Sequence, residues 1–552
     1  MTMNAMILET RIVSSLSKIF PDEPLTEARH TSGTALMNER YSFQIAYRCS
    51  QLEKGIALQV ESSLSLSVRT VGLVPSELPA YHDHDEHVLR TVPGLYPDPL
   101  FPFDEAEGLT AWPGQWRSIW ITITPDENVE AGLHRIAITF KSSKGEMLSK
   151  EVFELEIISV SLPEQKLLHT EWFHTDCLAV HYGVEVFSER HWEIVDSYVG
   201  YAASFGINML LTPLFTPPLD TEIGGERPTV QLVDVCVTDK DRYAFGFDKL
   251  KRWVDMCRKN GIQYMEFSHL FTQWGAKHAP KIIADVEGEY RQIFGWDTDA
   301  SGKEYERFLH QFLPELTAWI KEHGLEKQCY FHISDEPSLD SLNSYESANK
   351  MVKDLLAEFP IIDALSNYEF YEKGLVQNPI PANNHIEPFL QNGVDGLWTY
   401  YCCAQHNQVA NRFFNMPSAR NRIIGWQLYK YRIAGFLHWG FNFWYSQYSR
   451  KQIDPYRITD AGSAFPSGDA FLVYPGEDGP IGSIRLEVFY ESLQDLRSLE
   501  LLESLCGREQ AVALLDDDLS EPMTFSTYPR EASWLLKRRE RINRIVQEAK
   551  RS

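Results

Sequence analysis

The 552-residue sequence predicts a three-part chain of mixed β and α structure. We expect an N-terminal β-sandwich at residues 1–163, a central (β/α)8 barrel of the TIM type at residues 164–485, and a C-terminal helical segment at residues 486–552 that packs on the barrel. Three observations predict this order. Short alternating strands fill the first part, short apolar strands alternate with amphipathic helices in the second, and a charged helical pattern fills the third.

The first part alternates apolar and polar residues, as half-buried strands do. The pattern is clear at residues 42–47, 56–60 and 116–123, and it returns at residues 134–140 and 154–158. Short strands separated by polar turns are typical of a β-sandwich. Residues 80–113 are rich in His, Pro and Asp and lack periodicity, so we expect a long loop there.

The central part repeats a strand followed by a helix. We predict strands at residues 167–174, 207–211, 262–267, 329–333, 361–365, 396–401 and 435–444, and helices at residues 192–205, 247–260, 305–323 and 339–359. A doubly wound open sheet has the same local pattern. That fold usually carries a phosphate-binding glycine motif after a strand, and the sequence has none, so the pattern favours a barrel.

The chain is strongly acidic, with 52 Lys and Arg against 77 Asp and Glu and a formal charge of −25. A charge of this sign repels phosphate backbones and anionic lipids, so we expect no nucleic-acid or membrane partner. No apolar run approaches the roughly 20 residues that cross a bilayer. Residues 1–9 lack the basic and apolar regions of a signal peptide, which predicts a cytoplasmic protein.

Two adjacent carboxylates, Asp335 and Glu336, follow the fourth predicted strand and precede Pro337. The carboxyl ends of barrel strands form the active sites of such enzymes, so the pair is a candidate catalytic dyad. Both side chains enter one pocket only if the chain leaves strand geometry at Asp335, and Pro337 favours an extended Glu336. The alternative is a simple helix start, with Asp335 or Ser338 as the cap.

Aromatic residues recur at the ends of the predicted strands, which favours the catalytic interpretation. The flat C–H faces of sugars stack on such rings, so the pattern predicts a carbohydrate pocket. The candidate sugar-binding residues are Trp398, Tyr400, Trp439 and Trp444, with His174, His269 and Tyr368 as further candidates. No Cys or His cluster has the spacing of metal ligands, so we expect no metal and no cofactor.

The sequence resembles glycoside hydrolase family 123. One matching stretch is His-Ile-Ser-Asp-Glu-Pro at residues 332–337, which resembles the catalytic Asp-Glu pair that this family carries after a barrel strand. The other comprises residues 397–402, 422–426, 435–439, 468–476 and 483–487. The resemblance covers about residues 160–505, and an N-terminal β-sandwich also fits the family.

The resemblance implies an exo-acting, retaining β-N-acetylhexosaminidase, with β-linked N-acetylgalactosamine as the expected sugar. It implies that Glu336 is the general acid/base and that Asp335 orients the 2-acetamido group of the substrate. The acetamido oxygen then attacks C1, because an internal nucleophile has a high effective concentration. Glu336 needs a raised pKa for this role, whereas Asp335 must stay ionised.

Two alternatives remain open at this point. The first is a conventional retaining β-glycosidase, in which Glu336 is the acid/base and Glu266 or Glu369 is the nucleophile. The second is a glycan-binding protein without catalysis, in which the Asp-Glu pair only begins a helix. All three interpretations predict a carbohydrate partner.

Overall fold

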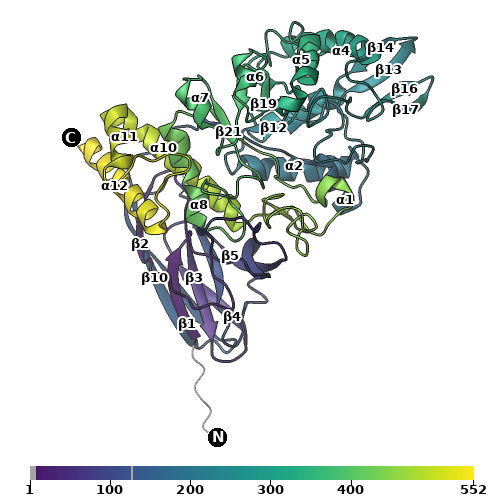
Figure 1. Cartoon of the computed structure of the whole chain (residues 1–552). Helices are drawn as coiled ribbons and strands as arrows, with labels where there is room; N and C mark the ends of the chain where they lie inside the picture. Colours follow the sequence, from purple (N-terminus) through teal and green to yellow (C-terminus); the bar gives the residue numbers. More distant parts are fainter. Residues whose placement is uncertain (1–7, 126–127, 552) are drawn as a thin grey trace.

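The computed structural model describes residues 8–125 and 128–551 and has a mixed β and α fold (Figure 1). Two five-stranded sheets form its N-terminal part. The first sheet has the antiparallel order β1 (Leu8–Ser14), β3 (Tyr41–Cys49), β8 (Arg117–Ile123), β5 (Leu66–Ser76), β6 (Gly94–Pro102). The second has the order β2 (Ser32–Leu36), β10 (Met147–Ile158), β9 (Gly132–Lys141), β4 (Glu53–Glu61), β7 (Leu109–Ala111).

The two N-terminal sheets share one apolar core. Phe43 and Ile119 from the first sheet are fully buried in the same cluster as Phe140 and Leu155 from the second. Alternate residues of strands such as β3 and β9 belong to this cluster, which is the reason for the alternation seen in the sequence.

The long loop expected at residues 80–113 is partly wrong, because this stretch contains β6 and β7. β6 carries three prolines, at positions 97, 99 and 102, and proline cannot donate a backbone hydrogen bond to a neighbouring strand. Proline is accommodated because β6 is the edge strand of its sheet, with β5 as its partner strand and, besides that, an isolated bridge between Pro99 and Ser483. The prolines thus conceal an edge strand from pattern analysis.

Short parallel strands form the central part. Six of them make one sheet in the order β18 (Cys329–Tyr330), β15 (Tyr264–Phe267), β12 (Met209–Thr212), β11 (Leu168–Glu171), β22 (Gly435–His438), β21 (Trp398–Tyr400). β19 (Ile362–Ala364) and β20 (Asn378–Ile380) form a separate parallel pair. Single parallel bridges join Phe331 to Ile361 and Ala382 to Tyr400, so this pair adjoins both ends of the six-stranded sheet.

All four helices predicted for the central part are present. They are α2 (Glu189–Ala203), α3 (Asp248–Lys259), α4 (Lys303–Glu322), and, with the 3₁₀ turn η1 (Leu339–Ser341) before it, a shorter α5 (Leu342–Val352). Gly206 and Gly261 follow α2 and α3 with φ of 78° and 91°, a conformation that glycine adopts without strain. Further short helices are α1 (Thr175–Tyr182), α6 (Glu369–Glu372), α7 (Glu387–Gln391), α8 (Ser418–Arg422), α9 (Ile424–Lys430) and η2 (Gln447–Ser449).

A small sheet that the pattern analysis missed lies in the loops after β12 and β15. Its order is β14 (Arg242–Gly246), β13 (Asp234–Asp239), β16 (Ile282–Val286), β17 (Glu289–Phe294), and it lies far from the N-terminal sheets (Figure 1). A second small hairpin pairs β23 (Tyr474–Pro475) with β24 (Pro480–Ile481).

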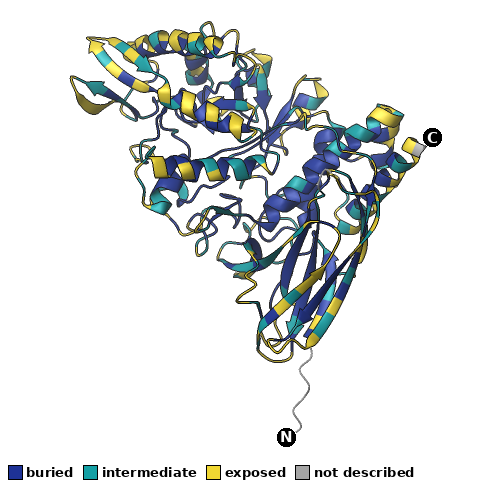
Figure 2. Cartoon of the chain, turned by 180° about the vertical axis from the view of Figure 1, so that it is seen from behind, coloured by how far each residue is buried: buried dark blue, intermediate teal, exposed yellow. Residues whose placement is uncertain are grey.

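The C-terminal helices are α10 (Ile484–Cys506), α11 (Arg508–Asp516) and α12 (Ala532–Arg551). α10 contacts α8, α9, α12 and β6, and most of its side chains are buried, as its dark blue ribbon shows (Figure 2). α12 contacts the edge strand β2, where Glu540 accepts hydrogen bonds from the backbone and the hydroxyl of Thr34. The C-terminal helices therefore join the N-terminal sheets to the central strands.

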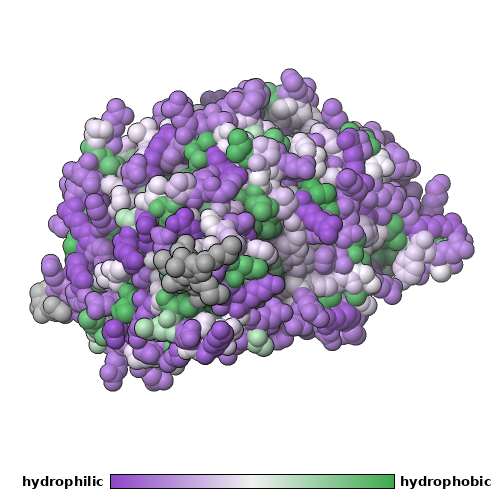
Figure 3. Space-filling model, turned by 90° about the horizontal axis from the view of Figure 1, so that it is seen from below, coloured by the Kyte–Doolittle hydropathy of each residue, from purple (hydrophilic) through white to green (hydrophobic). Residues whose placement is uncertain are grey.

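The surface is mixed in character. Figure 3 shows a face on which hydrophobic side chains appear in small separate groups among hydrophilic ones. Among the described residues, no helix is both long and apolar enough to span a membrane. The eight cysteines are all free thiols.

Candidate active site

A pocket of about 170 Å³ opens at the carboxyl ends of the central strands. Asp335 and Glu336 line it together, and each comes from the segment that follows β18. The other lining residues are Trp172, Leu219, Asp220, Gln273, Trp274, Ala364, Tyr400, Cys402, Cys403, Leu437, Trp439, Gln447, Tyr448 and Phe465. The pocket therefore combines a carboxylate pair with an aromatic wall, as the strand-end pattern predicted.

The backbone at Glu336 lets two neighbouring side chains face the same pocket. Glu336 has a φ of 43°, in the left-handed region that residues other than glycine rarely adopt. The extended conformation predicted from Pro337 is therefore wrong. The Glu336 N–H donates to the carbonyl oxygen of Ala364 at the end of β19, at 3.0 Å, and this tertiary contact outweighs the local preference.

The helix that follows does not use the pair as its cap. Ser338 occupies the N-cap position of η1, and its backbone N–H donates to the Ser341 hydroxyl at 3.0 Å. Asp335 and Glu336 precede this cap and line the pocket instead. Their carboxylates are thus available for chemistry.

Burial raises the pKa of both acids. Burial, and then the neighbouring Glu336, raise the pKa of Asp335 well above its usual value, although the His332 cation opposes this. Burial also raises the pKa of Glu336, while a 2.5 Å hydrogen bond from the Tyr400 hydroxyl to Glu336 Oε1 lowers it. Two adjacent carboxyls of this kind titrate as a unit and share a proton over part of the pH range.

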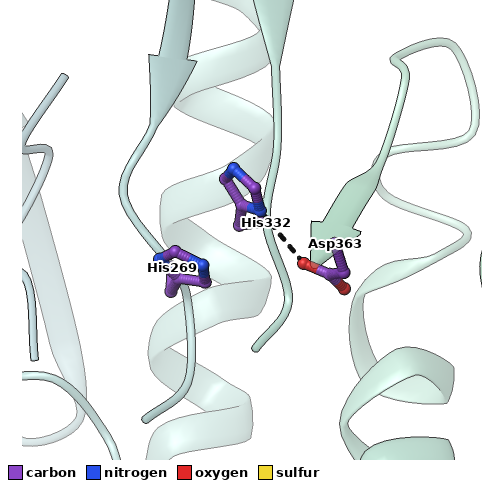
Figure 4. Close-up of side chains that lie close together, drawn as sticks. All are labelled: His269, His332 and Asp363. Carbon is purple, nitrogen blue, oxygen red and sulfur yellow. Dashed lines mark hydrogen bonds and ion pairs between the residues drawn. The ribbon is translucent and has the colours of Figure 1, made fainter. Parts of the chain in front are cut away.

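A buried ion network is centred on His332, three residues before Asp335, and Figure 4 shows its His332–Asp363 bond. His332 bonds through Nδ1 to Asp363 Oδ1 at 3.1 Å and through Nε2 to Glu266 Oε1 at 2.7 Å. Burial lowers the pKa of His332, but these two carboxylates outweigh it and raise the pKa to about 9. Glu266 also accepts hydrogen bonds from Thr170 and from the indole N–H of Trp172, which lines the pocket. Through Glu266, the network therefore holds the Trp172 indole in the pocket wall.

His269, His332 and Asp363 have potential metal-ligand atoms within 4.8 Å of one another (Figure 4). His269 stacks on His332 with ring centroids 4.2 Å apart, and burial keeps its pKa well below the usual value. Both nitrogens of His332 already donate to carboxylates, so the ring is a cation with no free lone pair. This protonated arrangement does not fit a metal site.

Two of the predicted sugar-binding residues, Tyr400 and Trp439, line the pocket. Tyr400 ends β21 and bonds to Glu336, as described above. The indole N–H of Trp439 donates to Asp469 Oδ2 at 3.0 Å, which fixes the ring at the end of β22. These two candidates therefore lie beside Asp335 and Glu336 in one pocket.

The other predicted sugar-binding residues lie outside the pocket lining. His174 is buried and bonds to the Trp439 carbonyl and to Arg227, and His269 lies in the layer beneath. Trp398 packs in the core between the central strands, Trp444 donates its indole N–H to the Val473 carbonyl, and Tyr368 packs on Phe389. Strand ends carry both pocket and core side chains, and local patterns do not separate them.

Several residues that line the pocket were not among the sugar-binding candidates predicted from the sequence. Trp172 and Trp274 belong to the strand-end aromatic pattern, whereas Asp220, Gln273 and Tyr448 have no local signal. Four lining residues have positive φ, namely Asp220 (39°), Trp274 (60°), Glu336 (43°) and Tyr448 (61°). Such strained positions concentrate at ligand sites, because only surrounding contacts hold them in place.

Comparison with known protein families identifies the chain. The model of the glycoside hydrolase 123 catalytic domain matches residues 172–502, which is more than half of the 552 residues. The chain belongs to glycoside hydrolase family 123. The matched region contains the pocket with Asp335 and Glu336. A glycoside hydrolase with a carbohydrate substrate follows from this membership, and the resemblance seen in the sequence is confirmed.

The solved structures include one of the same family. A family 123 glycoside hydrolase from Clostridium perfringens, described in a structural analysis of glycolipid glycan hydrolysis, aligns over 99% of both chains with a TM-score of 0.75 and 15% identity. This likeness shows a shared fold. A β-glucuronidase from Parabacteroides merdae aligns with a TM-score of only 0.31, at 11% identity over 88% of this chain and 51% of that one. Comparison with curated protein sequences finds no match.

Proposed function

We propose that this family 123 protein is an exo-acting, retaining β-N-acetylhexosaminidase that prefers β-linked N-acetylgalactosamine. Glu336 is the general acid/base, and Asp335 orients and polarises the 2-acetamido group. The acetamido oxygen attacks C1 and forms an oxazolinium intermediate, which water then opens with Glu336 as the base. Tyr400 and Trp439 contact the sugar. No cofactor takes part in this scheme.

The observation that carries the proposal is that the two acids are adjacent in sequence and line the same pocket. Asp335 and Glu336 are neighbours in one segment and face one pocket. Neighbouring residues do not reach opposite faces of a sugar ring, as the acid and the nucleophile of a conventional glycosidase do. An acid beside the general acid is instead well placed for a group next to C1, and the 2-acetamido group is such a group.

The two nucleophiles considered for a conventional mechanism have other partners. Glu266 is fully buried and accepts hydrogen bonds from Thr170, Trp172 and His332. Glu369 forms an ion pair with Lys373 on the surface of α6, at 2.7 Å. Neither lines the pocket. These positions favour substrate assistance over either residue as the nucleophile.

Asp220 supports a second candidate mechanism. Its carboxylate lines the pocket, and burial raises its pKa to about 6. It comes from a different loop than Glu336, so it is a candidate nucleophile for conventional retaining hydrolysis of a sugar that lacks the acetamido group.

Turnover of four aryl β-glycosides distinguishes the two mechanisms. The sugars are N-acetylgalactosamine, N-acetylglucosamine, galactose and galactosamine. Under substrate assistance, only the two N-acetylated glycosides are hydrolysed, and the N-acetylgalactosaminide is hydrolysed faster than the N-acetylglucosaminide. Hydrolysis of plain galactoside at a comparable kcat/KM would contradict the proposal and direct attention to Asp220.

Tyr400→Phe is expected to extend activity to higher pH. The hydrogen bond from Tyr400 stabilises the ionised form of Glu336 and lowers its pKa, so its loss raises that pKa. Activity is lost as pH rises through the pKa of the acid, and the basic limb of the kcat/KM profile is expected to move upward by roughly one pH unit. The pH profile on an aryl glycoside measures this. A basic limb that moves downward would contradict the assignment of Glu336.

We also propose the finer architecture expected from the sequence. The N-terminal sheets form a β-sandwich at residues 1–163, the eight parallel strands close a (β/α)8 barrel at residues 164–485, and the C-terminal helices at residues 486–552 complete the chain. Two parallel bridges support barrel closure. Phe331–Ile361 joins the β19–β20 pair to one end of the six-stranded sheet, and Ala382–Tyr400 joins it to the other end.

A further inference from the structure

We propose that Trp274 and Tyr448 form a subsite for the sugar ring on the leaving-group side of the scissile bond. The inference rests on the proposed function, because it concerns the other half of the same substrate. It would make the enzyme selective for a sugar-linked over a ringless leaving group.

Trp274 differs in exposure from the other aromatic residues of the pocket. Its relative exposure is 44%, against 2% for Trp172 and 6% for Tyr400. Its ring meets that of Tyr448 edge to face, with centroids 5.9 Å apart and an interplanar angle of 88°. Both residues line the pocket, so an aromatic surface reaches from the pocket into solvent.

The backbone at Trp274 has a strained conformation that surrounding hydrogen bonds hold in place. Trp274, Gly275 and Ala276 have φ of 60°, 128° and 54°, three left-handed residues in succession. The Trp274 N–H donates to the carbonyl oxygen of Asp335 at 2.8 Å, and the Ser344 hydroxyl donates to the Gly275 carbonyl at 2.5 Å. The backbone of Trp274 is thus attached directly to the segment that carries the two acids, and the indole projects from this fixed point. A lone exposed Trp needs no explanation, but a strained one fixed beside the acids does.

A second set of contacts fixes Tyr448 to the same side of the pocket. Asp220 accepts the Tyr448 N–H through Oδ2 at 3.0 Å, accepts the Ser449 hydroxyl through its carbonyl at 2.7 Å, and donates its own N–H to Gln273 Oε1 at 2.7 Å. The Glu222 N–H donates to the Tyr448 carbonyl at 3.0 Å. Three loops far apart in sequence are therefore joined into one rim, which presents Trp274 and Tyr448 in fixed positions.

The shape of the pocket decides which part of the substrate meets this rim. In an exo-acting enzyme the terminal sugar fills the inner pocket, which here has Trp172 and Tyr400 among its buried walls. Whatever is attached to C1 must leave through the mouth. Because Trp274 is bonded to the Asp335 backbone and half exposed, its ring lies at that exit, where it offers a flat apolar face to a second pyranose ring.

The experiment compares two substrates that share one sugar. They are β-N-acetylgalactosaminyl azide, whose leaving group has no ring, and a disaccharide in which the same sugar is β-linked to galactose. Trp274→Ala is expected to lower kcat/KM for the disaccharide by about tenfold or more, mainly through KM, and to leave the azide within about threefold. Trp274→Phe should recover most of the kcat/KM that Trp274→Ala loses on the disaccharide. Trp112→Ala is the matched control, because Trp112 is also 44% exposed but lies outside the pocket.

The outcomes separate this inference from the proposed function. Equal losses on both substrates in Trp274→Ala, or no loss on either, would overturn the subsite while the wild-type turnover still supports the function. A wild-type enzyme that hydrolyses neither substrate would overturn the proposed function and the subsite together.

Discussion

Glu336→Gln is expected to lower kcat/KM for a β-N-acetylgalactosaminide by about 10²–10⁴-fold, the usual contribution of a general acid/base. The amide keeps the shape of the side chain and its contact with Tyr400, but it has no proton to give to the leaving group. The loss should be smaller for an aryl glycoside whose phenol is strongly acidic, because that leaving group needs little protonation. Steady-state kinetics on two aryl glycosides of different leaving-group pKa measure this.

Asp335→Asn is the companion variant. With the shared proton of the pair on Glu336, Asp335 carries the negative charge that stabilises the oxazolinium. The substitution removes this charge, and the expected loss is about 10²–10³-fold, as for other preorganised electrostatic contacts. Glu369→Gln is the matched control, since Glu369 pairs with Lys373 on the surface and lies outside the pocket. Losses of less than tenfold in both pocket variants, with the control unchanged, would remove the pair from the mechanism.

Arg412→Met is expected to cost about 3–5 kcal/mol in the free energy of unfolding, the largest stability effect we predict. Arg412 and Glu171 are fully buried and form two parallel hydrogen bonds of 2.7 Å. Burial favours the neutral form of Glu171, but Arg412 outweighs it and holds the pKa of this carboxyl well below its usual range. Removing Arg412 leaves a buried carboxylate without its cation.

The surface offers a matched control for this prediction. Arg252 and Glu189 also form two hydrogen bonds of 2.7 Å, but their side chains are 45% and 79% exposed. Arg252→Met is expected to change the free energy of unfolding by less than about 1 kcal/mol, because water already screens this pair. Equal effects of the two substitutions in thermal or denaturant unfolding would contradict the buried-pair argument.

The pH dependence of these variants follows from the same pair. The depressed pKa of Glu171 contributes stability that is present above the pKa of the unfolded carboxyl and is lost as pH falls below it. In Arg412→Met the buried carboxyl keeps its His169 and His438 neighbours but loses the guanidinium, so it takes up a proton at higher pH than in the wild type. The difference in stability between wild type and variant should therefore shrink as pH falls from about 7 toward about 4.

Local sequence patterns located the candidate acids because both follow a recognisable strand and precede a proline. The same patterns located the helices that end at Gly206 and Gly261, since a left-handed stop has a local cause. They failed at β6, whose prolines are tolerated only because the strand lies at a sheet edge. Edge and centre positions are properties of the whole sheet and leave no local mark.

The family, the alternation of strands and helices, and the candidate acids Asp335 and Glu336 could all be recognised from the amino-acid sequence. Which strand-end aromatic residues reach the pocket could be seen only in the folded chain, with Trp439 in the pocket wall and Trp444 in the core. It also brought Asp220 and Tyr448 together across 228 residues of chain. Side-chain periodicity is set by neighbours along the backbone, whereas a pocket is assembled from loops whose paths depend on contacts between distant segments.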